Sequence, residues 1–162
     1  MLGQRTKITD LMPDPIPSSK NSVWPYVITA LLALVGLGDA IYLTIQDLTG
    51  QNLQCTIITG CAEVLGSKYA HLGSIPLATL GAFAYFVVFS LAILIVFGYS
   101  FARPLLQVLV VLMFLTTLWL IYLQAFVIRH FCQYCLLSAA VTTVIAIIVF
   151  GVSFARRGSV RS

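Results

Sequence analysis

The chain has 162 residues, of which 60% are hydrophobic and only 9% are charged, and its formal net charge is +4. Soluble domains are about 45–50% apolar and about 25% charged. A chain this short could not hide so much apolar surface inside a water-soluble fold. The composition therefore excludes an ordinary soluble domain and predicts one compact domain with the lipid bilayer as its solvent.

Four segments are long and apolar enough to cross a bilayer, which takes about 20 residues per helix. They cover residues 23–46, 75–98, 104–128 and 131–155. We therefore predict an all-α integral membrane protein, a four-transmembrane-helix bundle over residues 23–155 with an outer loop over residues 47–74. Residues 1–22 are expected to form a polar cytoplasmic tail, and residues 156–162 a basic one.

The basic residues are distributed unequally between the two sides of these spans. Only Lys68 and Arg129 fall on one side, against seven residues on the side of the termini. The seven are Arg5, Lys7, Lys20, Arg103, Arg156, Arg157 and Arg161. This asymmetry predicts cytoplasmic termini. It also accounts for the positive net charge, so no nucleic-acid partner is expected.

All four cysteines fall on the outer side, where an oxidising compartment permits disulfides. Cys132 and Cys135 form a Cys-x-x-Cys at the start of the fourth span, and on a helix this spacing brings the two Cα atoms to about 5 Å. A disulfide closing so short a loop stabilises a fold little, which favours a redox role. The helix N-terminus, with Arg129 and His130 before it, favours a thiolate at Cys132.

Cys55 and Cys61 lie in the outer loop with five residues between them, and their role has alternative interpretations. Taken alone, they suggest a structural disulfide, whereas beside the Cys-x-x-Cys they suggest a pair that shuttles electrons. All four cysteines could also hold a zinc ion. After Cys61, apolar Val64 and Leu65 among charged neighbours indicate a short amphipathic helix on the outer surface.

Other residues in and near the spans also require interpretation. Asp39 is an ionisable residue inside the first span, which makes it a functional candidate by default. A buried carboxyl hydrogen-bonded to a neighbouring helix is an equally good interpretation. Trp24, Tyr26 and Tyr42 lie near the span ends and are expected to be aromatic residues of the membrane interface.

Several of these features together resemble the vitamin K epoxide reductase family in its bacterial form, over residues 36 to 155. They are the run Gly-Leu-Gly-Asp-Ala-Ile-Tyr-Leu-Thr at 36–44, the pair Cys55 and Cys61 followed by Ser67, the run Gly-Ser-Ile-Pro-Leu at 73–77, and Phe-Cys-Gln-Tyr-Cys at 131–135. The placement of the cysteines on the predicted helices is the most specific part of this resemblance.

The resemblance implies a bundle around a quinone, such as ubiquinone or menaquinone, with a loop helix capping the site. It implies a bacterial inner membrane with the cysteines on the periplasmic side. In such proteins Cys135 matches the cysteine beside the quinone, and Cys132 the one that exchanges with the loop. Cys55 matches its loop partner, and Cys61 the cysteine facing a thioredoxin-like or DsbA-like protein.

Quinone contacts are expected from Cys135, Ser67, Leu65 and Asp39, where Ser67 occupies the Ser/Thr position of the family motif. His130 is a further candidate, as a proton donor near the quinone. The favoured hypothesis is a thiol:quinone oxidoreductase that reoxidises its partner and supports disulfide formation.

Two alternatives are a DsbB-like enzyme of the same chemistry and a non-enzymatic membrane protein with structural disulfides or a metal site. The DsbB-like plan carries its Cys-x-x-Cys on the first outer loop, where this chain has the wider Cys55–Cys61 spacing instead.

Overall fold

The computed structural model describes residues 23–49, 64, 71–72 and 75–159. Its long helices are α2 (Trp24–Thr49), α4 (Leu77–Val96), α5 (Ala102–Tyr122) and α6 (Gln133–Ser159), and α5 continues into the π-helical segment η2 (Leu123–Ile128). Two-residue strands β1 (His71–Leu72) and β2 (Ile75–Pro76) pair antiparallel just before α4, with His71 opposite Pro76.

The four predicted spans are confirmed. The helices long and apolar enough to cross a membrane are Trp24–Thr49, Leu77–Val96, Ala102–Ile128 and Gln133–Ala155, so the protein is an integral membrane protein. Their ends differ from the sequence prediction by a few residues. The second helix begins after Pro76, because residues 75–76 pair with β1 and the extended backbone of Pro76 precedes the first turn.

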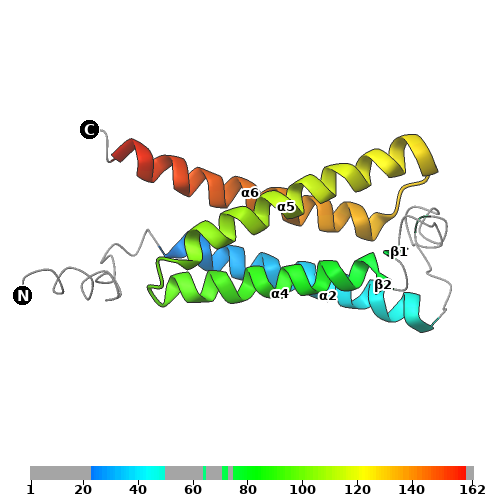
Figure 1. The fold of residues 1–162 in the computed structure, drawn as a ribbon, viewed down its shortest axis with the longest axis horizontal. Coiled ribbons are helices and arrows are strands. Elements are labelled where there is room, and N and C mark those ends of the chain that lie inside the picture. The colour runs from blue at the N-terminus through cyan, green and yellow to red at the C-terminus, as the bar shows by residue number, and fades with distance from the viewer. Residues whose placement is uncertain (1–22, 50–63, 65–70, 73–74, 160–162) are drawn as a thin grey trace, which may run out of the picture.

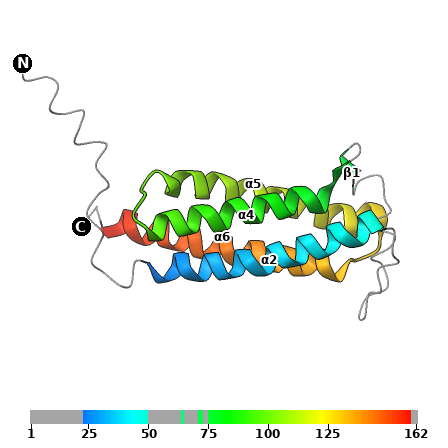
Figure 2. The ribbon, with the colours of Figure 1, turned by 90° about the horizontal axis from the view of Figure 1, so that it is seen from below.

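The helices cross the bundle alternately up and down (Figures 1 and 2). The start of α2, the end of α6 and the α4–α5 connection lie at one end, and the α5–α6 turn and the β1–β2 hairpin lie at the other. Helix α2 packs against α4 and α6, and α5 packs against α4 and α6. Consequently Arg103 and Arg129 lie at opposite ends of the bundle, as the charge pattern requires.

The side chain of Tyr85 joins three helices in the core. Its hydroxyl lies 2.8 Å from the hydroxyls of Ser138 and Thr142 on α6 and donates to the Ser138 carbonyl oxygen at 3.0 Å. Its ring lies against Gly36 of α2, where an added Cβ would overlap the ring. Small residues at helix contacts and hydrogen bonds across them are the usual means of helix association in lipid.

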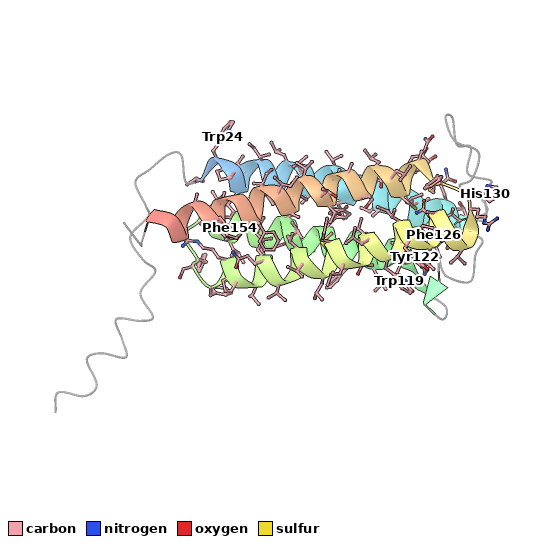
Figure 3. The ribbon with its side chains drawn as sticks, turned by 90° about the horizontal axis from the view of Figure 1, so that it is seen from above. Trp24, Trp119, Tyr122, Phe126, His130 and Phe154 are labelled. Atoms are coloured by element: carbon pink, nitrogen blue, oxygen red, sulfur yellow. The ribbon has the colours of Figure 1, made fainter. Side chains whose placement is uncertain are left out.

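Many large apolar side chains on the outside of the bundle remain exposed, as expected for surfaces that face lipid. On α5 and η2, Trp119, Tyr122 and Phe126 form an aromatic row, with ring centroids 6.0 and 5.0 Å apart (Figure 3). Trp24 is 67% exposed, as predicted for an interface aromatic. The same prediction is wrong for Tyr26, which is only 7% exposed because its position on α2 faces the bundle core.

The contact between Gly36 and Tyr85 gives a matched pair of glycine substitutions. Gly36→Ala places a methyl group into the Tyr85 ring, so we expect a loss of roughly 1–3 kcal/mol of unfolding free energy from overpacking. Gly38→Ala on the same helix meets no heavy atom within 4 Å and should leave stability unchanged or slightly higher. Thermal unfolding of both variants in detergent measures the difference, and equal melting temperatures would contradict this packing.

Candidate active site

The turn between α5 and α6 positions the Cys-x-x-Cys. Arg129 follows η2 with a φ of 57°, a left-handed conformation that reverses the chain direction. Cys132 lies immediately before α6, and its carbonyl oxygen accepts the N–H of Leu136 at 3.0 Å, the first hydrogen bond of the helix. Cys132 therefore occupies the N-cap position of α6, at the helix N-terminus predicted from the sequence.

Cys132 is completely buried, so its backbone N–H needs an acceptor within the protein. That acceptor is the side-chain oxygen Oε1 of Gln124, at 3.1 Å. Gln124 is itself only 3% exposed and lies in η2. Single π-helical turns of this kind often occur at functional sites.

Both cysteines of the motif are free thiols in the structure. A hydrogen bond from the Cys135 thiol lowers the pKa of Cys132 from its ordinary value of 9.0 to about 7. Burial opposes this change, while the backbone N–H groups of Tyr134 and Cys135 support it. Hydrogen bonds to the charged form are a general cause of such a decrease. Cys132 is therefore the more acidic thiol expected at a helix N-terminus.

A cavity lies between the helices at this end of the bundle. It holds about 870 Å³ of empty space, part of it open to the surroundings, and α2, α4, α5 with η2, and α6 all contribute to its wall. Sites for small molecules usually have mostly apolar linings with a few polar groups. Here the polar groups include Asp39, Gln124, Cys135 and Ser138.

The structure brings two of the predicted site residues to the same cavity, Asp39 and Cys135. The Oδ2 atom of Asp39 is buried and has no hydrogen-bond partner among the described residues. One interpretation of Asp39 was a carboxyl hydrogen-bonded to a neighbouring helix, but among the described residues Oδ2 has no such partner. Asp39 lines the cavity wall instead.

The other predicted site residues, Cys55, Cys61, Leu65 and Ser67, lie outside the described residues, and their roles stay predictions. Val64, the neighbour of Leu65, is described: it is buried, packs against Cys132 and contributes to the cavity wall. One residue of the outer loop therefore contacts the Cys-x-x-Cys directly.

His130 was predicted as a proton donor near the quinone, but its side chain is exposed at the end of the bundle and does not line the cavity (Figure 3). His130 is exposed because it lies in the turn between η2 and α6, two residues before the buried Cys132.

Two features were not predicted. Gln124 was missed, although a polar amide inside an otherwise apolar span is a signal that could have indicated it. Tyr42, predicted as an interface aromatic, is exposed and also packs on Tyr134, the second residue between the two cysteines of the motif, with ring centroids 5.3 Å apart. Gln46 donates a hydrogen bond to the Tyr42 hydroxyl at 3.0 Å. The contact of Tyr42 with Tyr134 links the end of α2 to the start of α6.

For the metal alternative, the residues that the structure describes contain no group of three or more His, Cys, Asp and Glu side chains able to hold a metal ion. Cys55 and Cys61, which a four-cysteine site would need, are not among them.

A pair of thiols at a helix N-terminus beside an apolar cavity is the arrangement expected of a membrane oxidoreductase that acts on thiols. The model of the vitamin K epoxide reductase family (VKOR) matches residues 27–150 of this chain. The chain therefore belongs to the vitamin K epoxide reductase family. Membership identifies it, in general terms, as a membrane oxidoreductase that couples disulfide chemistry to quinones.

The pKa of Cys132 predicts a pH dependence for its ionisation. With Cys55 and Cys61 replaced by alanine, the thiolate absorbance of the reduced protein should rise as the pH passes about 7. In the Cys135→Ala variant of this background the main stabilising hydrogen bond is lost, so the same rise should occur at higher pH, towards 9.0. Titration by ultraviolet absorbance checks both, and a Cys132 thiolate that forms at the same pH with and without Cys135 would contradict this cause.

Proposed function

We propose that this protein oxidises the thiols of a partner protein and passes the electrons to a membrane quinone, thereby supporting disulfide formation. The observation that carries the proposal is the shared cavity wall of Cys135 and Asp39. One of these residues can donate electrons and the other can hold a proton, and quinone reduction requires both.

The residues around the cavity fit a quinone. Its flat apolar ring suits the largely apolar lining, and its carbonyl oxygens need hydrogen-bond donors. The buried Oδ2 atom of Asp39 has no partner among the described residues, and a carboxyl at this depth is held at lower cost as the neutral acid, which can donate. Cys135 lines the same space. Ubiquinone and menaquinone both carry the required ring.

A quinone bound there accepts two electrons and two protons to become a quinol. Cys132 and Cys135 supply the two electrons when their thiols lose two protons and form one S–S bond. Cys132 ionises first, since its pKa is the lowered one, and Cys135 borders the cavity from which electrons leave. We assign to Asp39 the role of holding a proton beside the quinone carbonyl.

The reduced pair must be regenerated by an external dithiol, and the burial of Cys132 limits how this happens. A partner protein cannot reach a sulfur that is wholly enclosed, because thiol–disulfide exchange needs access to the attacked sulfur. We propose that Cys55 and Cys61 carry the electrons from a thioredoxin-like or DsbA-like partner to Cys132. The contact of Val64 with Cys132 supports this, because Val64 follows Cys61 by three residues in the sequence.

The proposed setting is a bacterial inner membrane with cytoplasmic termini and periplasmic cysteines. Arg103 near the start of α5 and Arg129 after the end of η2 lie at opposite ends of one continuous helix, which supports this orientation, given the excess of basic residues on the side of Arg103. Residues 1–22 and 156–162 would be cytoplasmic tails, and residues 23–155 the catalytic domain. A non-enzymatic protein with structural disulfides or a metal site is the competing function that the experiments below distinguish.

The two cysteines of the motif should respond differently to removal. Cys135→Ala should abolish quinone reduction, because the sulfur that borders the cavity is lost. Cys132→Ala should also stop turnover but leave a lone Cys135 sulfur, which should give a coloured charge-transfer band with added quinone. Absorbance spectra of the purified variants with a ubiquinone or menaquinone analogue measure this.

The matched control is the serine variant of each cysteine, which preserves size and polarity without redox chemistry. Quinone reduction that persists in the Cys132→Ala variant with any thiol donor would rule out the Cys-x-x-Cys as the catalytic pair. Absence of any quinone effect in all variants and in the native protein would favour structural disulfides instead.

The relay assigned to the loop predicts a dependence on donor size. Cys55→Ala or Cys61→Ala should block electron flow from a thioredoxin-like protein, whereas a small dithiol that can enter the site should retain part of the activity. Both donors are assayed with both variants, together with melting curves. A structural disulfide would instead cause parallel loss with both donors and a marked fall in thermal stability, and that result would exclude the relay.

A further inference from the structure

We propose that Gln124 is a positioning residue for the reaction, whose amide is fixed by the Cys132 backbone so that its NH₂ group faces Cys135 and stabilises the thiolate there. The inference rests on the proposed function insofar as Cys135 is taken to act on the quinone. The hydrogen bond itself is a property of the chain alone.

The orientation of the Gln124 amide follows from its partner. The oxygen and nitrogen of a glutamine side chain are easily confused, so an assignment needs a partner of one kind only. The backbone N–H of Cys132 can only donate, and it lies 3.1 Å from the position of Oε1. The oxygen must therefore face Cys132, and the NH₂ group must extend from the other side of the planar amide.

That other side faces the cavity. Gln124 and Cys135 both line it, so the NH₂ group lies in the same enclosed space as the Cys135 thiol. Gln124 is only 3% exposed, and a buried amide without partners would cost stability. Among the described residues, the buried side-chain nitrogen and oxygen atoms without a partner are Asp39 Oδ2 and Arg103 Nε, and no atom of Gln124 is among them.

One side chain thus binds the backbone of the first cysteine and borders the same cavity as the second cysteine. A donor aimed at Cys135 strengthens as the sulfur gains negative charge, because hydrogen bonds to charged groups are stronger. When the S–S bond forms and this charge disappears, the N–H group is released towards the cavity. There it can donate to a carbonyl oxygen of the bound quinone or quinol.

The test uses a chain in which Cys135 is the only cysteine, with Cys55, Cys61 and Cys132 replaced by alanine. The Cys132→Ala change leaves the backbone N–H that orients Gln124 in place. Adding Gln124→Met, which keeps the length and removes the polar atoms, should lower the thiolate absorbance at one fixed, mildly alkaline pH by about tenfold, from the loss of one hydrogen bond to a charged group. The charge-transfer band with a quinone analogue should weaken in parallel.

Gln107→Met is the matched control, since Gln107 lies on the same helix and hydrogen-bonds Ser153 near the opposite end of the bundle. It should leave both signals unchanged, which separates an effect on the thiolate from general loosening of α5. A second variant, Gln124→Glu, keeps an oxygen for the Cys132 N–H and replaces the donor by a second oxygen. In its ionised form it should lower the thiolate signal at least as much as Gln124→Met.

Unchanged thiolate absorbance in a folded Gln124→Met variant, judged by elution and melting, would overturn the inference. If the thiolate signal falls as expected but no variant or parent gives a quinone band, the inference stands and the quinone assignment of Cys135 fails. The two proposals are therefore tested separately by one set of proteins.

Discussion

A polar group within the apolar part of a bilayer must find its partner inside the protein, and the Tyr85 hydroxyl is where this requirement organises the bundle. Its hydrogen bonds to Ser138 and Thr142 fix α4 against α6, and its ring fits against Gly36 only because that residue has no side chain. Asp39 lies one helical turn after Gly36, and Ser138 belongs to both the hydroxyl network and the cavity wall. The packing that joins the helices therefore also sets the polar groups around the cavity.

The Cys-x-x-Cys stands between two environments. On one side, Val64 of the outer loop packs against Cys132. On the other, Cys135 borders the cavity together with Asp39 and Gln124. A dithiol placed in this way can exchange with a loop and still be shielded from the thiols of other proteins, since a protein thiol cannot reach the buried Cys132 directly. The same burial makes the more acidic thiol dependent on hydrogen bonds rather than on water for its ionisation.

The number of helices and the position of Cys132 at a helix N-terminus were predictable, because both follow from local patterns: the length of apolar runs and the spacing of the cysteines. The placement of Arg103 and Arg129 at opposite ends of the bundle was also predictable, because it follows from the number of helices. The inward orientation of Tyr26 did not, because a uniformly apolar helix carries no periodic signal to tell its lipid face from its core face. The contact of Tyr42 with Tyr134 could not be predicted, because it depends on how two helices that are far apart in the sequence pack against each other.

Gln124 could not be placed from helical periodicity for a more specific reason. An α-helix turns by about 100° per residue, and any prediction of which side chains share a face assumes that angle throughout. In η2 the chain takes a wider turn than an α-helix does. The residues before η2 therefore face a different direction, relative to Cys132, than they would in an uninterrupted α-helix. In evolutionary terms, the segment behaves as an insertion of one residue near the end of α5. A relative that lacked this residue would rotate position 124 away from the cysteines while keeping every span intact. Such a chain would retain the fold and the Cys-x-x-Cys but would have to satisfy the Cys132 N–H from another helix face.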